Sequence, residues 1–297
     1  MVKKPGTEVN EKVIVLTGAT SGIGLAAAAQ LAEQGALVLG VGRSVERCRK
    51  AEDQIRAEVP HARFTCLTAD LSSQQQIHSL YSEIHAELEK LGINRLDVLV
   101  NNAAMVTNWF TASENGYEMQ FAVNHLAPFL LTYLLFPLLK ESPAGRVLTV
   151  SSMSHRGARI HWKDIMLRHR YNTLRAYKQS KLANVLFSME LNRRFADESS
   201  ICAFAIDPGL VNTNIGMKGT SGFVHWFWDR RRRKGAPPSE PAKTIVHVAL
   251  DPEIQASQGV YWKECRPVPP ARSARKEEDA ARLWQLSQRL CGISDWG

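Results

Sequence analysis

Short apolar runs alternate with longer amphipathic stretches along most of this chain, and this alternation constrains the fold more than any other feature. The runs that predict strands lie at residues 13–17, 36–41, 63–68, 97–101, 146–151, 201–206 and 260–262. Because they lack polar alternation, the predicted strands should be buried on both faces. Strands that alternate with helices form parallel sheets. We therefore expect an α/β fold, a Rossmann-like doubly wound parallel sheet with helices on both faces.

The stretches between these runs have the length and periodicity of helices. The predicted helices lie at residues 23–34, 45–58, 113–139, 174–195, 240–250 and 276–290, and a further helix follows the third predicted strand and ends near residue 92. Pro128 falls inside the helix predicted at residues 113–139, so we expect that helix to be kinked there. The helix predicted at residues 276–290 is expected to be peripheral and amphipathic.

No internal repeat and no clean linker divides the chain, so we expect a single domain over residues 1–297. Within it we expect a cofactor-binding and catalytic core at 12–214, a substrate lid at 215–250, and the last strand with a C-terminal tail at 251–297. A chain of this length buries roughly three quarters of its unfolded surface, so it needs no disulfide or metal for stability.

Composition and charge exclude several classes of protein. Hydrophobic residues make up 44% and charged residues 22%, which is the balance of a globular chain. The five cysteines are scattered without a CxxC pair, which predicts a reduced compartment and no metal site. The longest apolar stretch, residues 129–139, is shorter than the roughly 20 residues of a bilayer span. We expect a cytoplasmic protein; peripheral contact with an intracellular membrane and a homodimeric state stay open.

A glycine-rich segment joins the first predicted strand to the first predicted helix. Its glycines let the backbone adopt positive φ and approach a ligand closely. The helix that follows directs its free amides and its positive dipole end at a pyrophosphate. A tight strand-to-helix turn is the alternative interpretation. The candidate phosphate-binding residues are Gly18, Thr20, Ser21, Gly22, Ile23 and Gly24.

The end of the second predicted strand indicates which dinucleotide is preferred. A carboxylate at this position usually accepts a hydrogen bond from a ribose 2′-hydroxyl. Here Arg43 and Ser44 follow the strand instead, and no acid occurs until Glu46. A guanidinium and a hydroxyl suit the 2′-phosphate of NADP(H). The alternative is that Arg43 is simply a solvated loop residue.

Tyr177 and Lys181 are four residues apart in a predicted helix and therefore share one face. A nearby ammonium and a positively charged nicotinamide would lower the pKa of the phenol from about 10. The phenol then exchanges a proton with an alcohol or carbonyl while hydride moves to or from the cofactor. Ser152, after the fifth predicted strand, is placed to hold the substrate oxygen. Asn124 is either a hydrogen-bonded core amide or part of a water-holding proton relay.

Together these motifs resemble the classical short-chain dehydrogenase/reductase family over about residues 12–214. The resemblance implies an oxidoreductase with a catalytic tetrad of Asn124, Ser152, Tyr177 and Lys181. It also implies adenine contacts at residues 70–71, an NNAG-like motif in which Ala104 replaces glycine, and a stretch at 207–213 that closes over the nicotinamide. The cofactor contacts implied in this way are Asp70, Leu71, Asn101, Ala103, Tyr177, Lys181, Pro208, Gly209, Val211 and Thr213.

Within that family the chain looks most like the retinol dehydrogenase-like branch. The spacing of 24 residues between Ser152 and Tyr177, the sequence of residues 177–184, and Arg43 are of that type. This likeness implies NADP(H) as cofactor and a lipophilic carbonyl or alcohol substrate such as a retinoid, a steroid or a lipid aldehyde. A cofactor-binding scaffold or sensor with little turnover is the alternative function, but the intact tetrad favours an enzyme.

Residues 223–234 combine four aromatic side chains with five consecutive basic ones. We expect an apolar lid over a lipophilic substrate, with its basic end resting on an anionic membrane. An ordinary surface helix is the main alternative. Nucleic-acid binding is not expected, because the remaining basic residues are dispersed and no nucleic-acid motif occurs.

Overall fold

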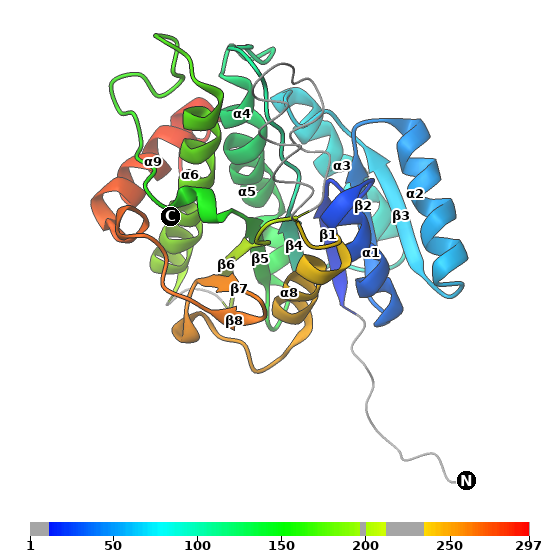
Figure 1. The fold of residues 1–297 in the computed structure, drawn as a ribbon. Helices are drawn as coiled ribbons and strands as arrows, with labels where there is room; N and C mark the ends of the chain where they lie inside the picture. The colour runs from blue at the N-terminus through cyan, green and yellow to red at the C-terminus, as the bar shows by residue number, and fades with distance from the viewer. Residues whose placement is uncertain (1–11, 197–199, 212–234, 297) are drawn as a thin grey trace, which may run out of the picture.

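The computed structural model describes residues 12–196, 200–211 and 235–296. Its strands form a sheet in the order β3-β2-β1-β4-β5-β6-β7-β8, parallel from β3 to β7, with β8 antiparallel to β7 (Figure 1). This arrangement confirms the predicted doubly wound α/β fold. The strands are β1 (Val13–Thr17), β2 (Leu37–Gly42), β3 (Arg63–Thr68), β4 (Val98–Asn101), β5 (Arg146–Val150), β6 (Cys202–Asp207), β7 (Tyr261–Lys263) and β8 (Arg266–Pro267).

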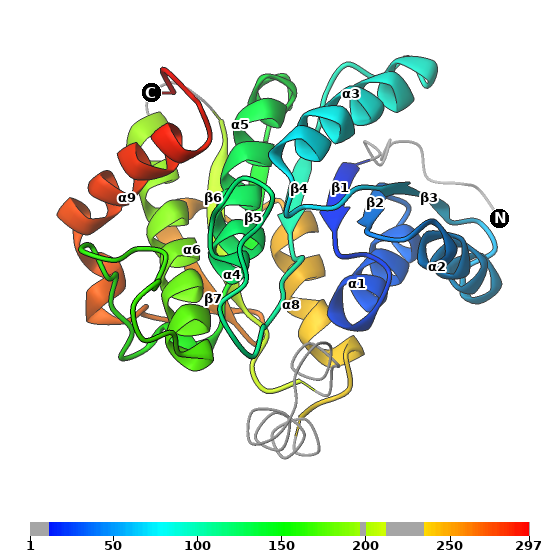
Figure 2. The ribbon, with the colours of Figure 1, turned by 90° about the horizontal axis from the view of Figure 1, so that it is seen from above.

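Helices cover both faces of the sheet, with α1 and α8 on one side and α3 and α5 on the other (Figure 2). Alternate side chains of β1 point to opposite faces: Ile14 and Leu16 pack with the first group, and Val13 and Val15 with the second. The longer helices are α1 (Gly22–Glu33), α2 (Val45–Glu58), α3 (Gln74–Lys90), α5 (Ala127–Lys140), α6 (Thr173–Phe195), α8 (Ser239–Leu250) and α9 (Glu277–Leu290).

β3 departs from the expectation that the predicted strands are buried on both faces. Arg63 and Thr65 are exposed, and their neighbours in the strand are only partly buried. The reason is position, because β3 pairs with β2 alone and forms an edge of the sheet. A charged or polar side chain on an edge strand also discourages pairing with a second molecule.

The helix predicted at residues 113–139 is shorter and less regular than expected. It begins at α4 (Met119–Phe121), passes through a π-helical turn at Ala122–Leu126, and continues as α5. The expected kink at Pro128 is therefore wrong in detail. Pro128 lies in the first turn of α5, where a missing amide costs little, and the irregularity is the π turn just before it.

The combined helix Met119–Lys140 is long and apolar enough to cross a membrane, and within the described residues it alone meets that criterion. Most of its apolar stretch is buried inside the protein, with Phe129 and Leu135 completely inaccessible. It therefore has the character of a central core helix that lies against the sheet.

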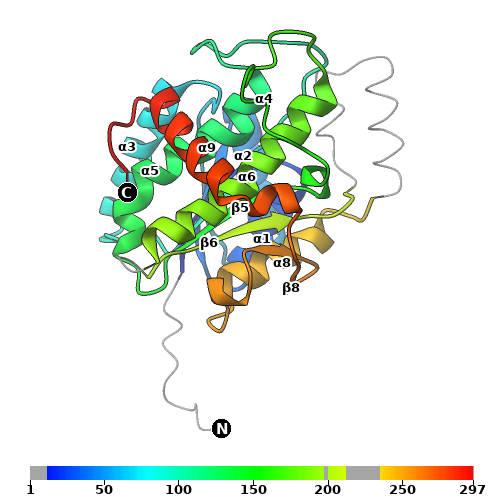
Figure 3. The ribbon, with the colours of Figure 1, turned by 90° about the vertical axis from the view of Figure 1, so that its left-hand side faces the viewer.

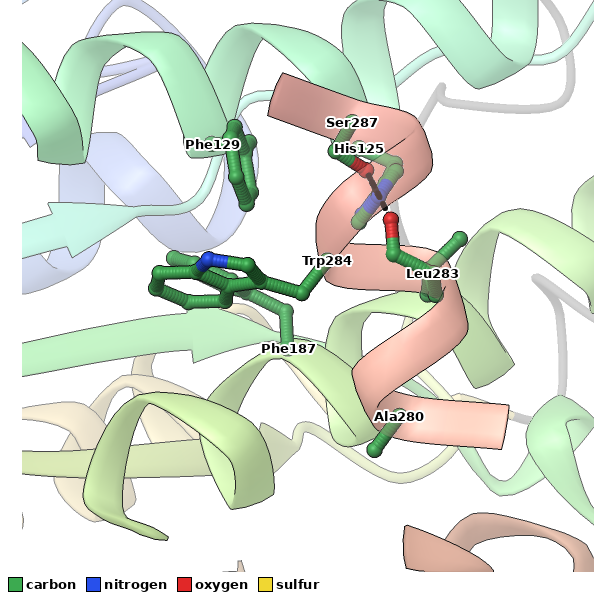
Figure 4. Close-up of a pocket in the computed structure, with 7 residues that line it drawn as sticks. All are labelled: His125, Phe129, Phe187, Ala280, Leu283, Trp284 and Ser287. Atoms are coloured by element: carbon green, nitrogen blue, oxygen red, sulfur yellow. Dashed lines mark hydrogen bonds between the residues drawn. The ribbon is translucent and has the colours of Figure 1, made fainter. Parts of the chain in front are cut away.

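The helix predicted to be peripheral, α9, is more deeply buried than expected. α9 lies against α6 (Figure 3), and its Trp284 is only 1% exposed. Figure 4 shows Trp284 beside Phe129 and Phe187. Trp296, near the end of the chain, joins the same aromatic cluster. One face of α9 is thus core, although the helix is amphipathic as predicted.

Candidate active site

The candidate site residues follow the carboxyl ends of successive strands, which parallel pairing brings to one edge of the sheet. Gly18 follows β1, Asn102 follows β4, Ser152 follows β5 and Pro208 follows β6. The strand order reverses between β1 and β4, since the chain runs outward to β3 and then returns. A crevice at such a reversal is the usual ligand site in open α/β sheets.

The glycine-rich loop depends on backbone contacts that no side chain would permit. Gly18 has a φ of +72°, and a Cβ there would lie 2.9 Å from Nδ2 of Asn102. A Cβ on Gly24 would overlap the carbonyl oxygen of Gly18. The start of α1 is therefore pressed against the loop, with the amides of its first turn at the same edge of the sheet. This cradle fits a dinucleotide pyrophosphate, which needs amide donors and close backbone approach.

Asn102 is a residue of the site that the sequence analysis did not select. Its Nδ2 donates to the carbonyl oxygens of Thr17 (2.8 Å) and Gly18 (3.4 Å). The hydroxyl of Thr17 in turn accepts from the amides of Asn102 and Ala103, each at 3.0 Å. These bonds join the end of β4 to the glycine-rich loop. The sequence signal that could have identified Asn102 was the polar pair Asn101-Asn102 at the end of a buried strand.

Asn101 is buried in β4 and donates from Nδ2 to the hydroxyl of Thr132 at 3.1 Å. Its Oδ1 has no hydrogen-bond partner among the described residues. Asp70 accepts from the amide of Ser72 at 2.9 Å, so its carboxylate shapes the turn after β3, and Leu71 beside it is partly buried.

Arg43 and Ser44 lie between β2 and α2, as expected. The Arg43 side chain is exposed, and Ser44 caps α2 by accepting from the amide of Arg47 at 3.5 Å. A Cβ on Gly42 would lie 2.7 Å from Sγ of Cys48, so the turn is tight here as well. The start of α2 thus combines amide donors with an exposed guanidinium.

Ser152 caps the short helix η2 (Met153–His155) directly after β5. Its Oγ accepts from the amide of Ser154 at 3.1 Å. The described bonds of Oγ leave its own hydrogen to donate toward a ligand. Ser151 beside it faces the other way and donates to the carbonyl oxygen of Lys181 at 2.7 Å.

Tyr177 and Lys181 share one face of α6, as the spacing predicts. The ammonium of Lys181 lies 5.7 Å from the centre of the Tyr177 ring and donates to the carbonyl oxygen of Val150 at 2.9 Å. Lys181 is 2% exposed, and burial lowers its pKa from 10.5 to about 7. Its position below the ring therefore places a titrating cation beside the phenol near neutral pH.

Asn124 lies in the π turn and is completely buried. Its Oδ1 accepts from the amide of Met105 at 2.8 Å, and its Nδ2 donates to the carbonyl oxygen of Met105 and to Ser180, both at 3.1 Å. The amide thus ties the segment after β4 to α6. These bonds fit the core-amide interpretation, and the water-holding relay stays a prediction.

The π turn is also held from the C-terminal side of the molecule. His125 follows Asn124, and its Nε2 lies 2.9 Å from the hydroxyl of Ser287 in α9 (Figure 4). Burial lowers the pKa of His125 to about 3, so its ring is neutral and structural.

The segment after β6 is only partly within the described residues. Gly209 has a φ of +69°, and its amide donates to Oδ1 of Asp207 at 2.9 Å. Pro208 and Val211 are partly buried, and Val211 pairs with Ala236. Thr213 and residues 215–234 of the expected lid region, including the aromatic and basic stretch 223–234, lie outside the described residues. Residues 239–250 of the same region form α8, which packs against α1 on one face of the sheet. Across the described ranges no cluster of His, Cys, Asp or Glu is placed to hold a metal ion.

Comparison with known proteins agrees with this geometry. The family model for short chain dehydrogenase matches residues 12–222. Mouse retinol dehydrogenase 12 is 35% identical over 96% of this chain and 88% of its own length, and human retinol dehydrogenase 13 is 35% identical over 95% and 85%. The crystal structure of an uncharacterised protein from Mycobacterium paratuberculosis superposes with a TM-score of 0.72 at 30% identity, covering 95% of this chain and 94% of that one.

The family match spans the glycine-rich loop, the π turn and α6, so it includes each side chain discussed above except those after residue 222. Proteins of this family bind a nicotinamide cofactor and transfer hydride between it and an alcohol or carbonyl. The chain therefore belongs to the short-chain dehydrogenase/reductase family of oxidoreductases and is similar, within that family, to the retinol dehydrogenases.

Proposed function

We propose that this protein is an NADP(H)-dependent oxidoreductase that interconverts the carbonyl and alcohol forms of a lipophilic substrate, with Tyr177 as general acid and base. The observation that carries the proposal is the placement of the Lys181 ammonium over the Tyr177 ring, 5.7 Å from its centre. The same ammonium donates to the carbonyl oxygen of Val150, at the carboxyl end of β5. This arrangement pairs an acid–base group with a dinucleotide cradle.

The protein's own groups supply proton transfer and orientation, while bound NADP(H) supplies or accepts the hydride. Ser152 donates a hydrogen bond to the substrate oxygen, because its Oγ already accepts from Ser154. Tyr177 then gives that oxygen a proton during reduction and removes one during oxidation. The Lys181 ammonium stabilises the phenolate that remains.

We propose NADP(H) rather than NAD(H) because Arg43 occupies the turn after β2 and is exposed there. Its guanidinium and the amides at the start of α2 suit the three oxygens of a 2′-phosphate. Ser44 already caps α2, so its hydroxyl shares that region with the phosphate.

A lipophilic substrate is consistent with two exposed apolar side chains in the segments that follow β4 and β5. Trp109, in the segment after β4, is 65% exposed, and Met153, next to Ser152, is 46% exposed. The similarity to retinol dehydrogenases points to the same substrate class. We further propose a cytoplasmic location with peripheral contact at an intracellular membrane.

The decisive experiment replaces Tyr177 by Phe, which removes the exchangeable proton and keeps the ring. We expect kcat with NADPH and a retinoid, steroid or aliphatic carbonyl to fall at least about a hundredfold, within the range of general acid–base catalysis. NADPH affinity should be retained, because the cradle is unchanged. Normal turnover in this variant would refute the assignment.

Tyr133→Phe is the matched control, because Tyr133 lies on α5 and packs against Trp296 away from the site. It should turn over like the wild type. A wild-type protein that binds NADPH but reduces none of the three carbonyl classes would instead indicate the scaffold or sensor.

A further inference from the structure

His155 lies between Ser152 and the Pro-rich segment that follows β8. It is the last residue of η2, and its side chain is completely buried. Both ring nitrogens have a backbone partner: Nδ1 lies 2.8 Å from the carbonyl oxygen of Ser152, and Nε2 lies 3.0 Å from the amide nitrogen of Ala271.

These two partners determine the tautomer of the ring. A backbone amide can only donate, so Nε2 must be the unprotonated acceptor for Ala271. A carbonyl can only accept, so Nδ1 must carry the hydrogen that it donates to Ser152. The geometry thus requires neutral imidazole with the hydrogen on Nδ1.

The imidazole completes the set of bonds that hold Ser152. The carbonyl oxygen of Ser152 accepts from the His155 ring and also from the His155 amide at 3.0 Å, while its Oγ accepts from Ser154. Residues of η2 therefore hold both the carbonyl group and the side-chain oxygen of Ser152. The direction of the remaining donor, the hydroxyl hydrogen, follows from this orientation.

We propose that His155 is a positioning residue for the reaction: in its neutral Nδ1–H form it fixes the backbone of Ser152, and the Ala271 amide fixes the imidazole. This inference rests on the proposed function, in which the Ser152 hydroxyl binds the substrate oxygen. Ala271 lies beyond the family match, which ends at residue 222, so the C-terminal segment contributes to the site through its backbone.

The surroundings of the ring agree with a neutral imidazole. Burial lowers the pKa of His155 below its usual 6.5; the Ser152 carbonyl opposes this shift, the charge of Arg156 adds to it, and Asp207 opposes it. Tyr261 packs on the ring with centroids 4.7 Å apart and donates its own hydroxyl to Asp207 at 2.7 Å. Arg156 donates to the carbonyl oxygen of Pro269 at 2.9 Å, which holds the C-terminal segment in place. A proton added to Nε2 would have to displace the Ala271 amide.

The tautomer is tested directly by nitrogen NMR of protein labelled with ¹⁵N-histidine, with His155→Asn used to assign the signal. We expect an unprotonated Nε2 and a protonated Nδ1 at neutral pH. The opposite tautomer would overturn the proposal without any reference to activity.

Ala271→Pro removes the amide donor and leaves the ring intact. The substitution suits the backbone, because Ala271 has a φ of −59°. Without that donor, protonation of Nε2 no longer breaks a bond, so the imidazole should titrate at higher pH. The same nitrogen NMR measures this rise in the pKa of His155. An unchanged His155 titration in Ala271→Pro would contradict the proposed contact between the Ala271 amide and the imidazole.

Two substitutions at His155 separate positioning from simple structural support. Asn places an amide donor where Nδ1 lies, and Gln places a carbonyl acceptor where Nε2 lies. We expect His155→Asn to keep kcat within about threefold of the wild type, and His155→Gln to lose about tenfold, the upper range for one neutral hydrogen bond. NADPH affinity should be unchanged in both.

Thermal stability gives the contrasting readout, since Gln keeps the link to Ala271 and Asn does not. A purely structural role predicts that activity follows melting temperature, with the Gln variant the better enzyme. That order, or equal kcat in the two variants, would overturn the proposal.

Turnover in the wild-type protein and in Ser152→Ala distinguishes failure of this inference from failure of the proposed function. If the wild-type protein reduces no carbonyl, the proposed function fails, while the tautomer of His155 is still tested by NMR. If Ser152→Ala retains full turnover, the role of the Ser152 hydroxyl fails and takes this inference with it, but the oxidoreductase activity stands. If Ser152→Ala loses turnover but His155→Gln does not, the inference alone fails. If the inference holds, His155→Gln should have little further effect on kcat in the Ser152→Ala background, because both changes act through one group.

Discussion

The two faces of the sheet are built from different kinds of contact. The face that carries α1 and α8 is rich in alanine, so its helices and glycine-rich loop approach closely through backbone atoms. The face that carries α5, α6 and α9 is rich in aromatic rings, with Phe129, Trp284 and Trp296 at its centre. The proposed cofactor loop adjoins the first face, while the candidate catalytic residues Tyr177 and Lys181 lie on α6 of the second.

This difference indicates that damage to the two faces should have different consequences. Backbone-limited packing leaves no room for an added carbon, so substitutions there should affect ligand affinity. Aromatic packing provides much of the buried apolar area, so truncations there should affect stability.

The largest effect is expected from Trp284→Ala on the aromatic face. Trp284 is 1% exposed, and removing such a ring costs about 3–5 kcal/mol of unfolding free energy. Urea denaturation should show this loss, while the protein that remains folded should bind NADPH normally. Trp109→Ala is the control, because that ring is 65% exposed and its loss should leave stability unchanged. Equal losses of unfolding free energy in the two variants would contradict the claim that aromatic packing stabilises this face.

The next effect is expected from Gly24→Ala on the alanine-rich face. The added Cβ would overlap the Gly18 carbonyl oxygen and displace the loop, so the Kd for NADPH should rise at least about a hundredfold, or about 2.7 kcal/mol. Gly35→Ala is the control, because nothing lies within 4 Å of a Cβ there and its φ of +86° should cost only stability. Unchanged NADPH binding in Gly24→Ala would show that the loop does not form the cradle.

A pH-dependent effect, smaller than these two over any one pH unit, is expected at Lys181, which lies among the helices of the aromatic face. Its pKa is about 7 in the folded protein and 10.5 ordinarily, so between these values the unfolded chain binds more protons. Stability should therefore rise with pH across that window, by up to about 1.4 kcal/mol per pH unit from this residue.

Lys181→Met should remove this contribution, so the unfolding free energy of the wild type minus that of the variant should increase as pH rises from 7 toward 10.5. The difference is the correct readout because burial also raises the pKa of Tyr261 and Cys291, which act in the opposite direction. A difference independent of pH would mean that Lys181 is charged throughout.

The smallest effect is expected at Arg43, at the exposed rim of the alanine-rich face. NADP(H) should bind at least about tenfold more tightly than NAD(H), or about 1.4 kcal/mol, and Arg43→Asp should reverse the order. Arg49→Asp, an exposed charge reversal on α2, is the control and should leave the preference unchanged. Equal affinities for the two cofactors in the wild-type protein would contradict the role of Arg43.

Local patterns in the sequence predicted most of the fold. The strands of the core and the helix at residues 173–195 lie within a residue or two of their expected bounds, because burial and periodicity are properties of neighbouring residues. The π turn was not predicted, since it depends on how α5 meets α6 through Asn124 and Ser180. β8 was missed because two residues carry too little periodicity to detect.

By itself, the sequence determined the α/β class, the position of the glycine-rich loop and the pairing of Tyr177 with Lys181, because each depends on spacing within one segment. Only the tertiary structure decided which distant groups meet. Asn102 reaches Thr17 across 85 positions, and Ala271 reaches His155 across 116. Such contacts follow from the order in which strands join the sheet and from where the C-terminal segment returns. That order is set by the burial of whole faces, which no single segment of sequence contains.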